Sequence, residues 1–254
     1  RCAAVVEAEF SQQHATVAEH LRLVAPQGDD PRVLLTELGL DHRSAAKPGQ
    51  LSTGERERLA VARALAARAG LLVLDEPFAH VDGALAERCW EVLWARLAAD
   101  GTDLVYTSHD PERVIGRADA LIVLAKGQVA WTGAVDALYR NPPDEATAQV
   151  LGPVDWLSPE DAAAFGLAAG CLRPEGVRIS ADPTGVATVQ ASRCHGAVTV
   201  TTLTAQDHTI TLRHRSPALA AGLRVAIQTA LMLLLMIAVG CGDAEPKLAV
   251  ASTT

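Results

Sequence analysis

Two adjacent carboxylates and a histidine follow apolar runs in this sequence, at places where side chains can meet a ligand. The run LLVL is followed by Asp75 and Glu76, and the run LVYTS by His109. Such runs are typical of buried parallel strands, and ligands bind at the carboxyl edge of an open parallel sheet. There Asp75 can hold Mg²⁺, Glu76 can orient or deprotonate an attacking water, and His109 can hydrogen-bond a γ-phosphate. The structural alternatives are an acidic N-cap before Pro77 and a histidine satisfied within a turn.

A second candidate is the stretch LSTGERERLAVARAL, which begins at Leu51. Ser52 and Glu55 have the spacing of a capping box, in which each side chain accepts a hydrogen bond from the other residue's backbone N–H. The same turn can hold an anion, because the start of a helix presents free N–H groups and the positive end of the helix dipole. Thr53 and Gly54 are small enough for an anion to reach the backbone. This stretch alone leaves both interpretations open.

The elements that must position these residues alternate along the chain. Apolar periodicity predicts two helical pieces within residues 16–45 and a helix from about Gly83 to Ala99. Strands are predicted at LLVLD, DLVYTS, ALIVLA and QVAWTG, with a short helix near residues 112–117. Strands that alternate with helices indicate βαβ units and a parallel sheet.

The second half of the chain has a different character. From about residue 170 the segments VATVQA, AVTVTTLTA and HTITLRH alternate apolar and polar residues, which is typical of half-buried antiparallel strands. All residues from Ala230 to Val239 are apolar, just ahead of Cys241. We expect Val225–Gly240 to behave as a membrane-inserting signal segment, with a core strand or helix as the alternative.

Composition narrows the class of protein. Hydrophobic residues make up 49% of the chain and charged residues 20%, which is a globular balance. The net charge of −8 gives no support to a nucleic-acid partner. The five cysteines contain no C-x-x-C pair, which argues against a zinc site or disulfide framework and favours a reducing cytoplasm; they are Cys2, Cys89, Cys171, Cys194 and Cys241.

Taken together, the motifs resemble those of the ATPase subunit of ABC transporters. The resemblance covers roughly residues 15–140 and rests on four motifs. Leu51–Glu55 is similar to the signature loop, and Leu71–Glu76 is similar to the Walker B motif with the catalytic glutamate. FAHVD, which ends at Asp82, is similar to the D-loop, and His109 is similar to the switch histidine. It implies ATP and Mg²⁺ as ligands. It also implies that Ser52, Thr53, Gly54 and Glu55 act on a nucleotide held by the other subunit of a head-to-tail dimer.

The sequence departs from the pattern of this family at several positions. Thr53 stands where glycine is usual, and Glu55 where glutamine is usual. Gln12 and Gln13 lie too close to Thr16 for the usual glutamine loop. The phosphate cradle G-x-x-x-x-G-K-[ST] does not occur in the sequence, so we expect an N-terminally truncated subunit that is inactive alone. The rival interpretations are a non-catalytic module that lends its signature loop to an intact ATPase, and the ATPase of a transporter with another substrate, such as an exporter or a lipoprotein-release system.

Two further resemblances suggest an importer. CLRPEGVRIS resembles the small regulatory β domain of ATPases that import molybdate, tungstate and sulfate. AVGC, ending at Cys241, resembles a lipobox whose cysteine is lipidated, and KLAVASTT resembles the first strand of tungstate-type binding proteins. The implied partners are a second ATPase subunit, transmembrane permease subunits and a solute-binding lipoprotein.

The sequence therefore predicts an α/β fold with three parts. Residues 1–143 form the C-terminal part of a P-loop ABC ATPase domain, with a helical subdomain and a parallel sheet. Residues 144–228 form a small antiparallel β domain. Residues 229–254 form a C-terminal hydrophobic segment, a lipoprotein signal followed by the start of a solute-binding protein. We expect residues 1–224 at the cytoplasmic face of the membrane and the C-terminal segment to cross it.

Overall fold

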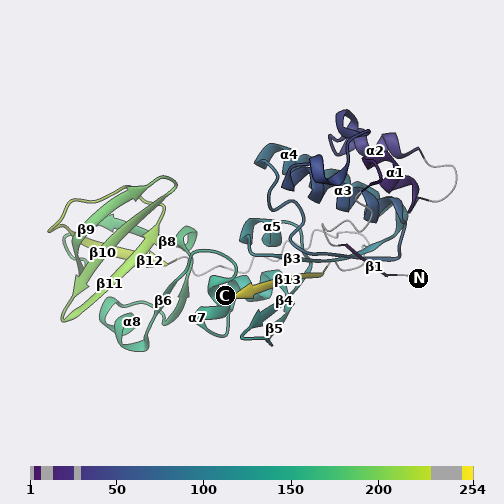
Figure 1. Ribbon diagram of the computed structural model, residues 1–254. Helices are drawn as coiled ribbons and strands as arrows, with labels where there is room; N and C mark the ends of the chain where they lie inside the picture. The colour runs from purple at the N-terminus through teal and green to yellow at the C-terminus, as the bar shows by residue number, and fades with distance from the viewer. Residues whose placement is uncertain (1–2, 7–13, 26–29, 230–247, 254) are drawn as a thin grey trace. The chain divides into compact units, whose positions relative to one another are not determined.

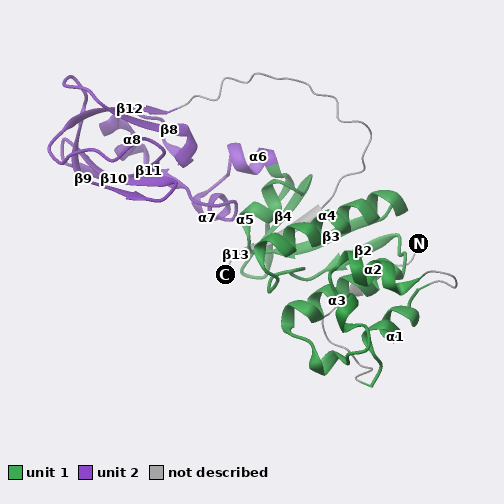
Figure 2. Ribbon diagram, turned by 90° about the horizontal axis from the view of Figure 1, so that it is seen from above, with its two compact units in different colours: residues 1–135, 244–254 green, residues 136–243 purple. Residues whose placement is uncertain are grey.

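The computed structural model describes residues 3–6, 14–25, 30–229 and 248–253 of the chain (Figure 1). These residues belong to two compact units (Figure 2). Unit 1 contains residues 1–135 together with 244–254, and unit 2 contains residues 136–243.

Unit 1 is built on a six-stranded sheet in the order β1-β2-β3-β13-β4-β5. Every neighbouring pair is parallel except β4 and β5, which are antiparallel. The strands are β1 (Ala3–Val6), β2 (Leu71–Leu74), β3 (Asp103–Ser108), β4 (Ala120–Ala125), β5 (Gln128–Ala134) and β13 (Leu248–Thr253). The parallel sheet predicted from the alternation of strands and helices is thus confirmed.

Of the five α-helices described in unit 1, four begin at a residue whose side chain caps the helix. The α-helices are α1 (Val17–Arg22), α2 (Pro31–Glu37), α3 (Thr53–Ala66), α4 (Gly83–Asp100) and α5 (Pro111–Ile115), and two 3-10 helices span Asp41–Arg43 and Pro48–Gln50. The predicted capping box at Ser52 and Glu55 is present at the start of α3. Gly101 ends α4 in the left-handed conformation, at φ 61°.

The guanidinium of Arg58 joins α3 to the end of α2. Arg58 is buried, and its Nη1 donates to the carbonyls of Leu38 at 2.7 Å and Gly39 at 2.9 Å. Its Nε donates to the Gly54 carbonyl at 3.3 Å. A buried charge is tolerated here because several backbone acceptors replace water.

Aromatic packing joins α4 to the strand ends. The Trp90 ring lies 5.5 Å from Phe78 and 5.2 Å from Tyr106, measured between ring centroids in edge-to-face geometry. All three side chains are almost fully buried. The Tyr106 hydroxyl donates to the Arg113 carbonyl at 2.9 Å, which holds α5 against β3. The loops that follow β2 and β3 are therefore anchored from both sides.

Unit 2 contains a five-stranded antiparallel sheet in the order β11-β10-β9-β12-β8, together with a two-stranded sheet of β6 and β7. Its strands are β6 (Asp155–Leu157), β7 (Gly170–Leu172), β8 (Val177–Ala181), β9 (Ala187–His195), β10 (Val198–Ala205), β11 (His208–His214) and β12 (Arg224–Thr229). The helices α6 (Val135–Arg140), α7 (Glu145–Gln149) and α8 (Pro159–Phe165) and the 3-10 turn Pro174–Gly176 complete the chain around it. The predicted antiparallel β segments are present.

The core of unit 2 follows the alternation of the sequence. Every second residue of β10 is buried. The core joins the sheet to α8 and β6 through the side chains of Leu157, Phe165, Val177, Ile179, Val189, Leu203, Leu212 and Val225. Thr201 and His214 are both buried, and a 2.7 Å hydrogen bond joins Thr201 Oγ1 and His214 Nε2.

The C-terminal part of the chain differs from the sequence prediction in two places. Val225, expected to open a membrane-inserting segment, is fully buried in β12, which pairs with β8 and β9. Residues 248–253, expected to start a separate solute-binding protein, form β13 of unit 1. Both segments are short and contain several β-branched or small residues, which suit a strand, and sheet pairing satisfies their backbone groups. Residues 230–247, with Cys241, lie outside the described part of the chain. Within that part, no helix has the length and apolar character needed to span a bilayer.

Candidate functional site

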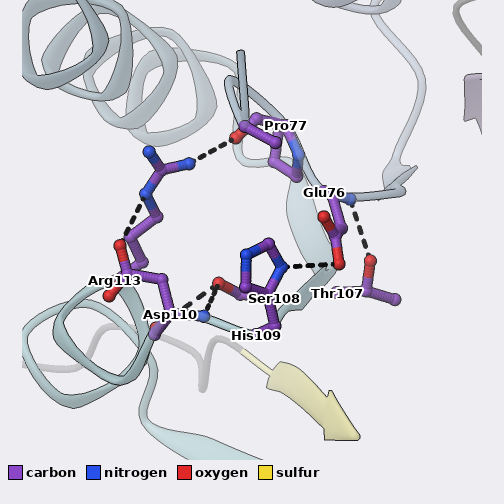
Figure 3. A pocket seen from close by; sticks show the side chains of 8 residues that line it. Glu76, Pro77, Thr107, Ser108, His109, Asp110 and Arg113 are labelled. Atoms are coloured by element: carbon purple, nitrogen blue, oxygen red, sulfur yellow. Dashed lines mark hydrogen bonds and ion pairs between the residues drawn. The ribbon is translucent and has the colours of Figure 1, made fainter. Parts of the chain in front are cut away.

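The strand-end acids and the histidine meet at one edge of the sheet of unit 1. Asp75 and Glu76 follow β2, and His109 follows the neighbouring strand β3. The His109 Nδ1 lies 2.8 Å from Glu76 Oε1 (Figure 3). Both side chains are open to solvent, since His109 is 72% exposed and Glu76 43% exposed. The structure thus brings these predicted residues together, in a position that a ligand can reach.

Thr107, which the sequence analysis did not single out, joins the two carboxylate residues. Its hydroxyl donates to Asp75 Oδ1 at 2.5 Å and accepts from the Glu76 backbone N–H at 2.8 Å. One hydroxyl thereby fixes the carboxylate of one residue and the backbone of the next. The signal for it was its position two residues before His109 on a predicted strand.

The backbone at Glu76 is in the left-handed region, at φ 42°. A non-glycine residue rarely adopts this conformation, and such residues cluster at functional sites. Here the Thr107 hydroxyl holds the Glu76 N–H. The turn directs the Glu76 carboxylate toward the His109 ring (Figure 3).

A small polar pocket surrounds this pair, and Figure 3 shows its lining. Arg113 of α5 lies on its far side, where the guanidinium Nε is 3.1 Å from Asp110 Oδ2 and Nη1 donates to the Pro77 carbonyl at 3.4 Å. The pocket is lined by Glu76, Pro77, Ala79, Thr107, Ser108, His109, Asp110 and Arg113. Sequence reasoning missed Arg113, whose guanidinium brings a positive charge to the lining and is paired there with Asp110.

Asp75 offers the chemistry that a magnesium ion requires. It is exposed and supplies one carboxylate, and Mg²⁺ commonly takes one or two carboxylates from a protein and its other ligands from water and phosphate oxygens. Within the part of the chain that the structure describes, no group of three or more His, Cys, Asp or Glu side chains is arranged to hold a metal. A single exposed carboxylate is compatible with an ion whose other ligands are water and phosphate oxygens.

At the start of α3, the capping interpretation accounts for Glu55. Ser52 Oγ accepts from the Glu55 N–H at 3.2 Å, and Glu55 Oε2 accepts from the Ser52 N–H at 2.8 Å. Arg43 Nε also donates to Glu55 Oε1 at 2.8 Å. These bonds, that of Arg43 above all, lower the pKa of Glu55 to about 2. Because its carboxylate is engaged within unit 1, Glu55 supports the helix start, while Ser52 and Thr53 remain exposed.

The structure gives a different reason for glycine at position 54 from the one that the sequence suggested. A Cβ at this position would lie 2.5 Å from the carbonyl oxygen of His80 and 3.4 Å from Val81 Cγ2. Glycine is required here because the segment after Glu76 packs directly on α3. The small size of Gly54 thus allows this close packing and does not serve to open the backbone to an anion.

Glu57 and His80, also missed by the sequence analysis, fasten the same contact. The His80 backbone N–H donates to Glu57 Oε2 at 3.0 Å, and His80 Nδ1 lies 2.5 Å from Glu57 Oε1. Asp82 follows at the exposed N-cap of α4, where its side chain makes no capping bond. Residues 76–82 therefore link the acid–histidine pocket to the start of α3.

Comparisons with known proteins show what the chain is similar to. Residues 1–79 match the family model described as ABC transporter. Over about half of its length, the chain is similar to import ATP-binding proteins. The sulfate/thiosulfate import ATP-binding protein CysA 2 of Chromobacterium violaceum is 35% identical over 129 residues, which are 51% of this chain and 35% of that protein. The thiamine import ATP-binding protein ThiQ of Shigella sonnei is 33% identical over 133 residues, which are 49% of this chain and 57% of that protein.

The chain spans less than two thirds of the length of these ABC relatives. The spermidine/putrescine import ATP-binding protein PotA of Pseudomonas fluorescens is 32% identical, with 57% of this chain and 42% of that protein covered. Among solved structures, one described as the ATP binding subunit of an ABC transporter superposes with a TM-score of 0.47 at 24% identity, covering 54% of this chain and 61% of that one.

Proposed function

We propose that this chain is part of the ATP-hydrolysing subunit of an ABC importer. The observation that carries the proposal is the pairing of Glu76 with His109 across the ends of β2 and β3, with Asp75 beside them. The similarity of the chain to import ATP-binding proteins supports the same assignment.

Each residue has a role that its position allows. Glu76 polarises the water that attacks the γ-phosphate, since its carboxylate is exposed and its backbone is held by Thr107. In its imidazolium form His109 has a donor on each ring nitrogen, so that Nδ1 can donate to Glu76 and Nε2 to a phosphate oxygen. Asp75 would hold Mg²⁺, which supplies charge neutralisation when ATP is bound.

The start of α3 completes a site on a partner subunit. Ser52 and Thr53 are exposed, and the first turn of the helix carries free N–H groups that favour an anion. We assign Ser52, Thr53 and the Gly54 backbone to the nucleotide of a second ATPase subunit, with Asp82 at the same interface. Since Gly54 packs against His80 and has no side chain, its backbone N–H is the group that we assign to this role.

The further partners and the substrate follow from the importer assignment. Transmembrane permease subunits and a solute-binding protein would complete the transporter. For the substrate, we propose an oxyanion such as tungstate or molybdate, on the resemblance of unit 2 to the regulatory β domain of such importers. The matched relatives are named for sulfate, polyamine, iron and thiamine import, so substrate assays need to include all four classes.

The test uses a hybrid protein, because the sequence contains no phosphate cradle. The segment of the Chromobacterium violaceum relative that carries its phosphate-binding loop is joined ahead of residue 1, and phosphate release and ATP binding are both measured. In this hybrid, Glu76→Gln is expected to lower turnover by about 100-fold or more while ATP binding is retained. Glu91→Gln, an exposed acid on α4, is the matched control and leaves turnover unchanged. Turnover of Glu76→Gln within about threefold of the parent would reject the role of Glu76.

The rival function, a module that only lends its signature loop, predicts a different result. In that case the hybrid would not hydrolyse ATP, and the chain mixed with an intact ATPase subunit would raise that subunit's turnover. Ser52→Ala in this chain would then abolish the stimulation, whereas Glu76→Gln would not.

A further inference from the structure

The outer edge of β11 in unit 2 is covered at the end of the strand. β11 is the first strand of its sheet, so in the described part of the chain its ladder neighbour is β10 alone. Near the end of β11, the Arg213 N–H donates to Asp155 Oδ2 at 2.5 Å. Just beyond the strand, Ser216 Oγ accepts from the Ile179 N–H of β8 at 3.1 Å. Side chains thus serve as hydrogen-bond partners where this edge approaches β6 and β8.

The bond between Arg213 and Asp155 shows which backbone groups of β11 point outward. The Arg213 N–H faces Asp155 and therefore does not face β10. In an antiparallel ladder, residue pairs that exchange hydrogen bonds alternate with pairs that exchange none. Thr211 and Thr209 follow at intervals of two in an unbroken register with β10, so their N–H and C=O groups point outward as well. The hydroxyl oxygens of Thr211 and of Thr202 opposite it are 3.1 Å apart, which suits a closely spaced pair without backbone bonds.

These outward groups open into a pocket of about 290 Å³. The strand β6 and the helix α8 contact β11 here (Figure 1). Thr209 and Thr211 are exposed, and among the described residues their N–H groups have no counterpart of Asp155. The pocket therefore offers two backbone donors and two backbone acceptors at the spacing of a strand. Its lining includes Glu145, Trp156, Asp161, Thr209, Thr211 and Arg213.

The rim of this pocket is acidic. Asp161 accepts a hydrogen bond from the Ser158 hydroxyl at 2.7 Å, and its Oδ1 lies 2.9 Å from His208 Nδ1. These contacts, that of Ser158 above all, lower the pKa of Asp161, so its carboxylate is ionised at neutral pH. Glu145 is exposed at the first position of α7. Two carboxylates therefore stand beside the open half of the edge.

Arg213 does not neutralise these two carboxylates, because its guanidinium is engaged elsewhere. Its Nη1 donates to Asp155 Oδ1 at 2.5 Å and to the Val154 carbonyl at 3.3 Å. The Asp155 side chain is only 6% exposed, so this ion pair is internal to unit 2. A segment that carries positive charge complements the remaining rim of Glu145 and Asp161, and a segment that carries negative charge is repelled.

We propose that the open half of the β11 edge, residues 209–211, binds an extended segment of a partner protein that carries lysine or arginine. The segment adds a short strand to the sheet through the backbone groups of Thr209 and Thr211, and its basic side chains meet Glu145 and Asp161. Backbone pairing supplies the affinity, and charge selects the partner. This role belongs to unit 2 alone and is separate from the nucleotide chemistry proposed for unit 1.

Amide exchange of the full chain tests the proposal with a model ligand. The probe is a hexapeptide of alternating lysine and valine, acetylated and amidated at its ends, and the amides are followed by NMR during the titration. At saturation, the amides of Thr209 and Thr211 are expected to shift and to exchange about tenfold more slowly, while those of α3 in unit 1 do not change. The absence of shift and protection at Thr209 and Thr211 overturns the proposal.

Two matched peptides separate backbone pairing from charge. A hexapeptide of alternating glutamate and valine keeps the capacity for pairing and reverses the charge. A lysine–valine hexapeptide that is N-methylated at every residue keeps the charge but has no N–H to donate. Neither is expected to protect Thr209 and Thr211. If either peptide binds as tightly as the probe, the recognition does not use both features and the proposal is overturned.

Proline at position 211 removes one outward N–H and spares the ladder to β10, because an edge strand tolerates proline where its N–H faces solvent. Thr211→Pro is expected to weaken binding of the lysine–valine peptide by about tenfold or more, and Thr211→Val, which keeps the N–H, to bind within about twofold of the parent. Unchanged exchange of the β9 amides verifies the fold. Equal affinity in the two variants overturns the proposal.

A second pair of variants leaves the backbone untouched. Glu145→Gln is expected to weaken binding of the lysine–valine peptide by about two- to fivefold and to reduce its salt dependence. Glu160→Gln, an exposed acid of α8 outside the pocket lining, is the matched control and keeps the parent affinity. Equal affinity in these two variants overturns the proposal. So does protection of Thr209 and Thr211 without any peptide, whether constant or rising with protein concentration, because the chain itself or a second copy then covers the edge.

Discussion

The carbonyl oxygen of His80 lies 2.5 Å from the point that a Cβ on Gly54 would occupy. Glu57 holds His80 there through both its backbone N–H and its ring. The start of α3 and the segment after the catalytic-site candidate Glu76 are therefore one packed body. A larger side chain at position 54 would therefore have to displace the segment after Glu76, and a shift of that segment would disturb the start of α3.

The first prediction concerns the size of residue 54. Gly54→Ala places a methyl group against backbone that cannot yield without moving residues 78–82, so we expect a loss of about 1–3 kcal/mol in the free energy of unfolding. Chemical denaturation monitored by tryptophan fluorescence measures it. Gly49→Ala is the matched control, because a Cβ there meets nothing within 4 Å. Equal losses in both variants would contradict the packing argument.

The second prediction concerns the buried Arg58. Arg58→Met keeps the length of the side chain but leaves the carbonyls of Leu38 and Gly39 without their donor. We expect a loss of about 1–3 kcal/mol in the free energy of unfolding of unit 1. Arg56→Met, which removes only a 3.3 Å bond to Thr53 at the surface, serves as control and should change stability by less than about 0.5 kcal/mol.

The third prediction is an acid dependence that comes from Glu55. Its pKa is about 2 in the folded chain, against a usual value of 4.5, so the unfolded chain binds more protons between these values. Its contribution to stability is complete above pH 4.5 and is lost as the pH falls toward 2. In Glu55→Gln, the free energy of unfolding of unit 1 should fall less steeply between pH 5 and pH 3. Glu91→Gln should retain the slope of the parent; a Glu55→Gln slope that matches it would refute the assignment.

The fourth prediction is a second pH dependence, this time in unit 2. Burial lowers the pKa of His214 below its ordinary value of 6.5. The unfolded chain therefore takes up a proton near pH 6.5 before the folded chain does, and the stability of unit 2 falls as the pH drops from 7 through 6.5. His214→Gln should reduce this slope, although it also lowers the stability at pH 7 by weakening the bond to Thr201. His195→Gln, at an exposed position, is the control that should behave as the parent.

Local signals in the sequence were sufficient for much of the fold. The capping box needs only Ser52 and Glu55, three residues apart, and it formed as predicted. The strand before Asp75 is a continuous apolar run, and the alternation within β10 decides which of its side chains are buried. In each case the physical cause lies within one element.

The features that sequence reasoning missed depend on pairing across the sheet or between elements. Thr107 meets Asp75 only because β2 and β3 are neighbours, although the residues are 32 positions apart. The contact of Glu57 with His80 joins residues 23 positions apart. The pairing of residues 248–253 with β3 and β4 spans a whole second unit. The spacing of residue types along the sequence does not predict such contacts.

The place of β13 has a consequence for how the protein is made. The strand that completes the middle of the first unit's sheet is the last strand of the described chain to be synthesised. At roughly 5–20 residues per second, it leaves the ribosome on the order of ten seconds after β4. During that interval all strands of the second unit are already made, while β3 and β4 are not yet joined through β13. Until β13 is made, the edges of β3 and β4 lack this partner, and a strand edge without its partner is prone to pair with another chain.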